Sequence, residues 1–120
     1  MVSQRVYLYV RFAIQAECLE EFQKTAETMT ALTRHEPGTL GYEWFFSGEA
    51  TQCRLVETYA DAGAVLAHLG GAAVQEHFPQ LLRIASISGI EVYGDPGPEA
   101  AKILLGFGAE IFQFGNGLGR

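Results

Sequence analysis

Two ionisable side chains lie in apolar surroundings near the middle of this chain, and both are of types that transfer protons. Glu57 shares a predicted strand face with Leu55 and Tyr59, an unusual place for a carboxylate. His68 follows Ala64 by one helical turn, so the two share the inward face of a predicted helix. Since histidine titrates near neutral pH and can accept a phenolic proton, the pair predicts acid–base chemistry beside an apolar pocket.

Each of these side chains also has a structural interpretation. His68 could bond to a backbone group or to Glu57 and stabilise its helix or a subunit interface. Glu57 could orient His68 or bind a substrate hydroxyl, but it could equally bond helix N-terminal amides or an arginine across an interface. Burial raises the pKa of a carboxyl group and a cationic partner lowers it. The sequence leaves both interpretations open.

Aromatic residues accompany the two candidates and could bind a flat substrate by stacking. Those on the second predicted strand could equally be ordinary core side chains. His77, beside Phe78 on a later helix, could reach the pocket mouth or lie on the surface. The candidate substrate-binding residues are Trp44, Tyr42, Phe46, Tyr59 and His77.

These residues are positioned by elements whose hydrophobic periods alternate between two and about 3.6 residues. Pro37-Gly38 ends the first helix, a hairpin containing Gly48 joins the second and third strands, and Asp61 is a helix N-cap candidate. The expected elements are a strand over 5–13, a helix over 17–34, strands over 39–47 and 51–59, helices over 62–69 and 72–85, and a short strand over 89–93.

This order predicts an α+β, ferredoxin-like β-α-β-β-α-β domain over residues 1–94, with both helices on one face of a four-stranded antiparallel sheet. The opposite face should be polar in a monomer, but it carries large apolar residues. A second copy of the sheet would cover them, so we expect a homodimer through this face. These residues include Tyr7, Tyr9, Phe45, Val56 and either Ile90 or Val92.

Residues 95–120 form a C-terminal extension after Asp95-Pro96-Gly97-Pro98. A helix over 99–105 and a short strand over 111–114 are expected, and neither is long enough to fold alone. The extension should pack on the edge of the domain or reach across to the partner subunit, where its strand could pair with an exposed sheet edge.

Composition excludes several classes of function. The chain has 120 residues, a formal charge of −6 and scattered basic residues, which disfavours nucleic-acid binding. It contains no apolar window long enough to span a membrane, and residues 1–5 run into a strand without a signal-peptide core, so we expect a cytoplasmic protein. Cys18, Cys53 and the three histidines lack metal-ligand spacing, and no cofactor fingerprint is present. We therefore expect neither metal nor cofactor.

Four features together resemble the antibiotic biosynthesis monooxygenase family over roughly residues 5–94. They are the turn from Glu36 to Tyr42, the aromatic strand after it, the strand ending Leu55-Val56-Glu57-Thr58-Tyr59, and the helix from Asp61 to His68. The resemblance implies a dimeric α/β barrel with one pocket per subunit, between sheet and helices, and it matches His68 to a family position at the end of its helix. Members include cofactor-independent oxygenases of phenols, quinols and anthrone-like polyketides, but also isomerases and proteins without known activity.

Two kinds of function follow as hypotheses. The first is a cofactor-independent monooxygenase that oxidises a small phenolic, quinol or polyketide-like compound, with His68 as base and Glu57 as its partner. The second is a non-catalytic module that binds an apolar metabolite or responds to stress. An isomerase using the same pocket is a further alternative.

Overall fold

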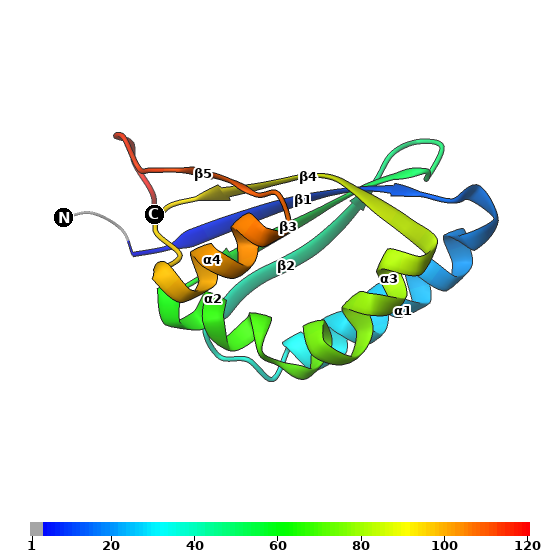
Figure 1. The fold of residues 1–120 in the computed structure, drawn as a ribbon, viewed down its shortest axis with the longest axis horizontal. Helices are drawn as coiled ribbons and strands as arrows, with labels where there is room; N and C mark the ends of the chain where they lie inside the picture. Colours follow the sequence, from blue (N-terminus) through cyan, green and yellow to red (C-terminus); the bar gives the residue numbers. More distant parts are fainter. Residues whose placement is uncertain (1–3) are drawn as a thin grey trace.

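In the computed structural model, which describes residues 4–120, one sheet carries helices on a single face (Figure 1). Met1–Ser3 lie outside this range. They belong to the N-terminal stretch that is expected to contain no signal-peptide core. The elements are β1 (Val6–Ile14), η1 (Ala16–Cys18), α1 (Leu19–Thr33), β2 (Thr39–Phe46), β3 (Gln52–Tyr59), α2 (Ala62–Leu69), η2 (Ala73–His77), α3 (Phe78–Ile84), β4 (Ala85–Tyr93), α4 (Pro98–Gly106) and β5 (Glu110–Phe112).

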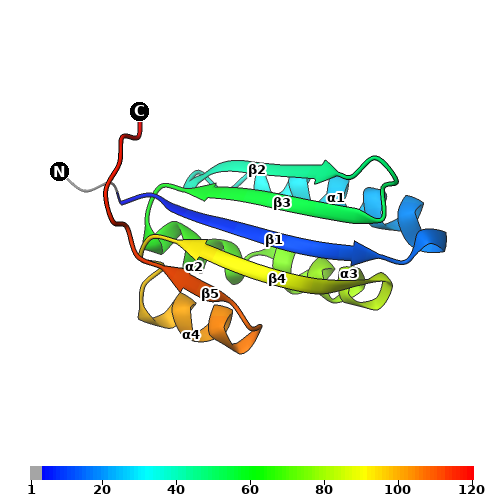
Figure 2. The same cartoon turned by 90° about the horizontal axis from the view of Figure 1, so that it is seen from above.

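The strand order across the sheet is β2-β3-β1-β4-β5, as seen from above in Figure 2. The first four strands pair antiparallel, and β5 adds to β4 in parallel. The arrangement of β1 to β4 confirms the ferredoxin-like α+β prediction. The pairing of β5 gives the predicted C-terminal strand a place on the edge of its own sheet.

The helix α1 forms because its apolar residues recur every three to four positions. Phe22, Ala26 and Met29 are buried against the sheet, while the intervening positions are mostly exposed. Glu20 and Glu21 lie in its first turn, where a carboxylate interacts favourably with the helix dipole. The predicted helix over 17–34 is thus confirmed, with its first residues in the short 3-10 turn η1.

The single helix expected over 72–85 is instead two segments. A π-helical turn, η2, ends at His77, and the α-helix α3 begins at Phe78 with Pro79 in its first turn. Proline has no N–H to donate to the preceding turn, so the regular α pattern is interrupted before it.

The fourth strand is longer than the sequence predicts. A β-bulge interrupts the alternation of apolar residues, so the first half of the strand cannot be recognised from the pattern. The apolar alternation indicates a strand only from Gly89, yet β4 starts at Ala85. Along β1, Arg11 pairs with Gly89 but the next residue pairs with Ile87, so Ser88 is an extra residue in the ladder. The bulge reverses the phase of the inward and outward positions, and the two halves do not form one alternating pattern.

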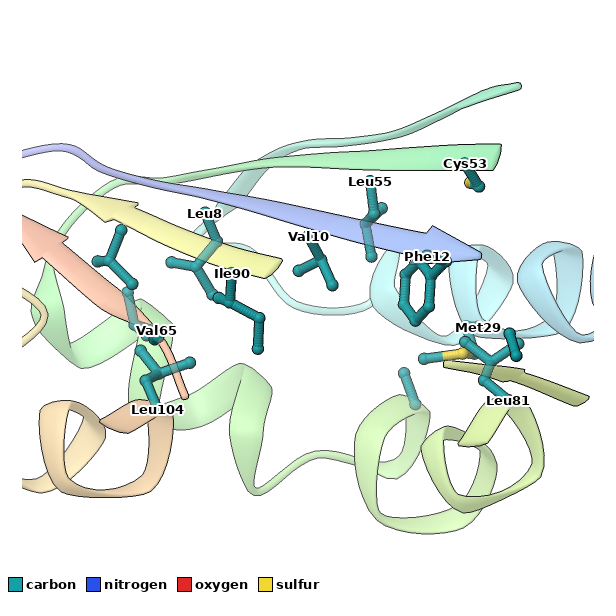
Figure 3. Packing of buried hydrophobic residues seen from close by; sticks show 14 of the residues in the cluster. Leu8, Val10, Phe12, Met29, Cys53, Leu55, Val65, Leu81, Ile90 and Leu104 are labelled. Atoms are coloured by element: carbon teal, nitrogen blue, oxygen red, sulfur yellow. The ribbon is translucent and has the colours of Figure 1, made fainter. Parts of the chain in front are cut away.

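The core lies between the sheet and the helices (Figure 3). All inward positions of β1 are buried, and a large ring such as Phe12 contributes roughly 1.5–3 kcal/mol by leaving water. Ile90 and Val92, one of which was a candidate for the opposite face, both point inward and are buried. The side chains labelled in Figure 3 are Leu8, Val10, Phe12, Met29, Cys53, Leu55, Val65, Leu81, Ile90 and Leu104.

Leu40 departs from the expected strand pattern. The alternation predicts that it shares the inward face of β2 with Tyr42, but 52% of its surface is exposed. The pairing of β2 with β3 shifts between Thr39 and Gly41, and this irregularity turns the intervening side chain outward.

The face of the sheet opposite the helices is open in the isolated chain. Tyr9, Phe45 and Phe112 are 42%, 54% and 39% exposed there, and Val56 is half-buried. These side chains come from four strands of one sheet, so they form a single surface, which we call the open face. No helix among residues 4–120 has the length and apolar character needed to cross a bilayer.

Candidate active site

The helix α2 brings His68 into the interior. Asp61 Oδ1 accepts a hydrogen bond from the Ala64 N–H at 2.9 Å, which caps the N-terminus of α2 as predicted. Gly38 lies under the same helix, since a Cβ at that position would come within 2.5 Å of the Ala64 Cβ. This close approach of turn and helix leaves His68 only 3% exposed.

Glu36 holds one side of the imidazole. Its Oε1 lies 2.7 Å from His68 Nδ1 and also accepts a hydrogen bond from Thr39 Oγ1 at 3.0 Å. From the sequence pattern, Glu36 is expected in a turn, with no role in the site. The one available signal was an acidic residue just past the C-terminus of a helix, where the helix dipole favours a cation instead.

Glu57 faces the other side of the imidazole. It is 4% exposed on β3, its Oε1 lies 3.6 Å from His68 Nε2, and it accepts a hydrogen bond from the Tyr59 hydroxyl. Burial raises the pKa of the Glu57 carboxyl group, although the His68 charge and the Tyr59 hydrogen bond act in the opposite direction. The site therefore contains a carboxyl group that holds a proton more tightly than an exposed one.

The contact with Glu36 favours one tautomer of a neutral imidazole. When Nδ1–H is donated to the Glu36 carboxylate, the lone pair is on Nε2, next to Glu57. A proton can then be exchanged between Nε2 and the Glu57 carboxyl group, whose Oε1 lies 3.6 Å away. The Glu36–His68–Glu57 cluster thus holds its imidazole at Nδ1 and leaves Nε2 facing Glu57.

Two of the predicted aromatic residues contact this cluster directly. The ring centroids of Tyr42 and Tyr59 lie 5.2 and 5.5 Å from that of His68. Trp44 stands one layer further out, with its ring 5.7 Å from Tyr42 at nearly a right angle. Phe46 lies beyond, 36% exposed and in edge contact with Phe22 on α1.

His77 is not brought to the cluster. It is half-buried on η2, and its Nδ1 lies 3.2 Å from Gln80 Oε1 in the following helix. The structure thus joins His68 with Glu57, Tyr42 and Tyr59, and leaves His77 in a local contact of its own.

Two hydroxyl groups beside the cluster lack hydrogen-bond partners. Thr33 Oγ1 and Tyr42 Oη are both buried, and they lie near each other without completing a hydrogen bond. Burial raises the pKa of the Tyr42 phenol well above its usual range, with the Glu57 charge as a second cause. Unpaired buried hydroxyl groups are costly, so a ligand that supplies a partner would gain affinity here.

Removing the hydroxyl groups of Tyr42 and Tyr59 should have opposite effects on stability. Tyr59→Phe takes a hydrogen bond from a buried carboxyl group and should lower the free energy of unfolding by about 1.5–3 kcal/mol. Tyr42→Phe removes an unpaired group and should leave that energy unchanged or raise it by up to about 1 kcal/mol. Urea denaturation of both variants measures the difference, and equal losses would contradict the assignment of partners.

His68 is absent from the linings of two hollows on the described chain. One, of about 680 Å³, runs between α1 and β2, and Trp44 forms part of its wall. The other, of about 1200 Å³, lies between the C-terminal residues, the start of β1 and the turn before α4. In residues 4–120 no group of three His, Cys, Asp or Glu side chains is arranged to hold a metal ion.

Fold and site together define an α+β protein of the ferredoxin-like class with an acid–base cluster buried between sheet and helices. The sequence model of the family described as "Antibiotic biosynthesis monooxygenase" matches residues 5–80. The chain belongs to this family. No curated protein matches the sequence significantly.

Solved structures agree with this assignment. MupZ from Pseudomonas fluorescens is 27% identical, with a TM-score of 0.83 over 98% of this chain and 96% of that one. A protein from Caulobacter crescentus, provisionally named as an antibiotic biosynthesis monooxygenase, is 22% identical, with a TM-score of 0.67 over 75% and 88% of the two chains. A conserved protein from Methanosarcina mazei is 19% identical, with a TM-score of 0.68 over 75% and 91%. The likeness to MupZ thus includes the C-terminal extension.

Proposed function

We propose that this protein is a cofactor-independent monooxygenase that oxidises a small phenol, quinol or polyketide-like aromatic compound. The observation that carries the proposal is the anchored imidazole. Glu36 holds His68 Nδ1 at 2.7 Å, so that Nε2 is the basic nitrogen, and the rings of Tyr42 and Tyr59 surround it. An electron-rich substrate that loses a proton in such a site becomes a strong one-electron donor, and family membership supports oxygen as the acceptor.

For an anthrone-type methylene group, the reaction converts CH2 and O2 into C=O and H2O. His68 Nε2 takes the first proton, the substrate anion passes one electron to O2, and the two radicals join through a new C–O bond. The resulting peroxide anion takes a proton back from His68. Removal of the remaining C–H proton then breaks the O–O bond, and the departing hydroxide is protonated to water. All four electrons that O2 accepts come from the substrate carbon.

Glu57 is suited to the last proton transfer. Burial raises its pKa, and it lies on the side of the imidazole that faces away from Glu36. A buried acid next to a base allows one group to remove the C–H proton while the other protonates the leaving hydroxide.

Oxygen uptake tests the proposal directly. The purified protein is mixed with a panel of hydroquinones and anthrones in the presence of a chelator, and O2 consumption is compared with that of the substrate alone. With an anthrone, the proposal expects one O2 consumed per quinone formed, with one oxygen atom from ¹⁸O2 retained in the product. Product formation at the same rate without O2 would instead identify proton-transfer chemistry such as isomerisation.

One observation favours the second candidate function, a non-catalytic binding module. His68 is 3% exposed, and it is absent from the linings of both hollows described above, so the imidazole is buried in the isolated chain. Tight binding of an aromatic compound without turnover, under aerobic and anaerobic conditions alike, would support that function.

A homodimer through the open face forms part of the proposal. Tyr9, Phe45 and Phe112 are exposed together on one surface, and apolar patches of this kind mark interaction sites. An identical sheet packed face to face would cover them on both subunits.

Phe45→Glu should therefore convert the dimer to a monomer, with the dimer dissociation constant rising at least about a hundredfold. Phe45 is 54% exposed in the isolated chain, so the change should not disturb folding itself. Sedimentation equilibrium measures the mass, and Leu105→Glu, 55% exposed on α4, is the matched control expected to remain dimeric. If the Phe45 variant kept the dimer mass, the interface would lie elsewhere.

A further inference from the structure

The hollow between α1 and β2, here called the α1–β2 groove, has the shape of an elongated binding site. Its helical wall comes from positions spaced by three or four residues along α1, which form one continuous stripe of about 16 Å. Its floor is formed by two aromatic side chains of β2. The lining residues are Gln23, Ala26, Glu27, Thr30, Ala31, Arg34, Trp44 and Phe46.

The two ends of the groove differ in charge. Arg34 lies at the end nearest the acid–base cluster, next along the chain from Thr33, and its guanidinium has no ion-pair partner in the described part of the chain. Glu27 lies two helical turns away, roughly 10 Å along α1. A ligand with one negative charge would therefore bind in a single direction, with its anionic group at Arg34 and its apolar body toward Phe46.

Trp44 separates the groove from the cluster. Its Nε1–H donates to Thr30 Oγ1 at 2.9 Å, which holds the indole against the helical wall. The same ring contacts Tyr42, whose ring contacts His68. One of the two unpaired hydroxyl groups belongs to Tyr42, and the other belongs to Thr33, the neighbour of Arg34 in the chain. A molecule in the groove is thus one aromatic side chain away from polar atoms that need a partner.

We infer that the α1–β2 groove binds an aromatic carboxylate, with the carboxylate on Arg34 and the ring on Trp44, and that it is the entrance to the buried cluster. Arginine pairs with a carboxylate through two parallel hydrogen bonds, which a neutral amide cannot reproduce. The aromatic floor provides a stacking surface for a flat ring. This inference rests on the proposed function for the identity of the ligand as substrate, but the binding itself does not require turnover.

Trp44 is the only tryptophan in the chain, so the tryptophan fluorescence comes from the floor of this groove. The test is a titration of Trp44 emission with 2-naphthoate and with its neutral isostere 2-naphthamide. We expect 2-naphthoate to change the emission at a concentration at least about tenfold lower than the amide does. Arg34→Gln should remove this preference, Arg34→Lys should restore part of it, and Arg83→Gln, an exposed change on α3, should leave it intact.

Equal binding of the two probes, or a preference that survives in Arg34→Gln, would overturn the inference. Because no oxygen is needed, the result is separable from the proposed function. Selective binding of 2-naphthoate by a protein that consumes no O2 with any substrate would support the groove as a binding site and contradict the proposed oxygenase activity. Oxygen uptake without any preference for the carboxylate would support the oxygenase activity and contradict the groove as a carboxylate-binding site.

Discussion

His68→Gln is expected to lower kcat for the oxidised substrate by about 10²–10⁴-fold, with little change in KM. Glutamine approximates the volume of the imidazole and can still bond to Glu36, but it cannot accept a proton at neutral pH. The loss therefore measures proton transfer rather than collapse of the site. Steady-state oxygen uptake over a range of substrate concentrations separates kcat from KM.

Glu36→Gln provides the companion test, since Glu36 acts through His68 and is a positioning residue. The glutamine amide can donate to Nδ1, which would move the imidazole proton to Nε2 and hide the basic nitrogen from the substrate. We expect kcat to fall by at least about tenfold, and up to about 10⁴-fold as for other carboxylates that orient a histidine. Imidazole ¹⁵N chemical shifts report the change of tautomer, which a merely structural role would not produce. Unchanged turnover in both variants would show that His68 is not the base.

Much of the fold could be predicted from the sequence, because local periodicity and burial agree over most of the chain. The inward residues of β1 and α1 follow strict periods of two and about 3.6, and the helix cap at Asp61 is a local signal. The failures within the sheet occur where pairing between strands overrides the local pattern. The extra residue Ser88 and the irregularity at Leu40 are set by neighbouring strands, which single-strand alternation does not contain.

The site was only partly predictable for a related reason. Glu57 and His68 each stand out locally as polar residues in apolar elements, and the structure places them 3.6 Å apart. Glu36 does not stand out in this way, because it lies in a turn, where polar residues are common. Its partner His68 is 32 residues further along the chain. Its role depends on how closely α2 packs on the Gly38 turn, and that distance is a property of the assembled fold.

The buried Glu57 should make the stability of the protein fall as pH rises. Its pKa is raised in the folded state, so the folded protein binds more protons than the unfolded chain at pH values between the two pKa values. This contribution is fully present below the ordinary carboxyl pKa and is lost as pH rises through the raised one. The steepest expected slope is about 1.4 kcal/mol per pH unit.

Glu57→Gln isolates this effect, because glutamine keeps an acceptor for the Tyr59 hydroxyl but cannot ionise. His68, Tyr59 and Glu36 also act on the carboxyl group, so the quantity to measure is the difference in unfolding free energy between wild type and variant at each pH. That difference should increasingly favour the variant as pH rises. Glu91→Gln is the matched control, since Glu91 also accepts a hydrogen bond from a tyrosine two residues later but lies half-buried on the open face. The difference for the Glu57 variant should change more with pH than the difference for this control. A Glu57 difference that does not change with pH would mean that this carboxyl group is ionised in the folded protein at no cost, and that His68 has no neighbouring acid.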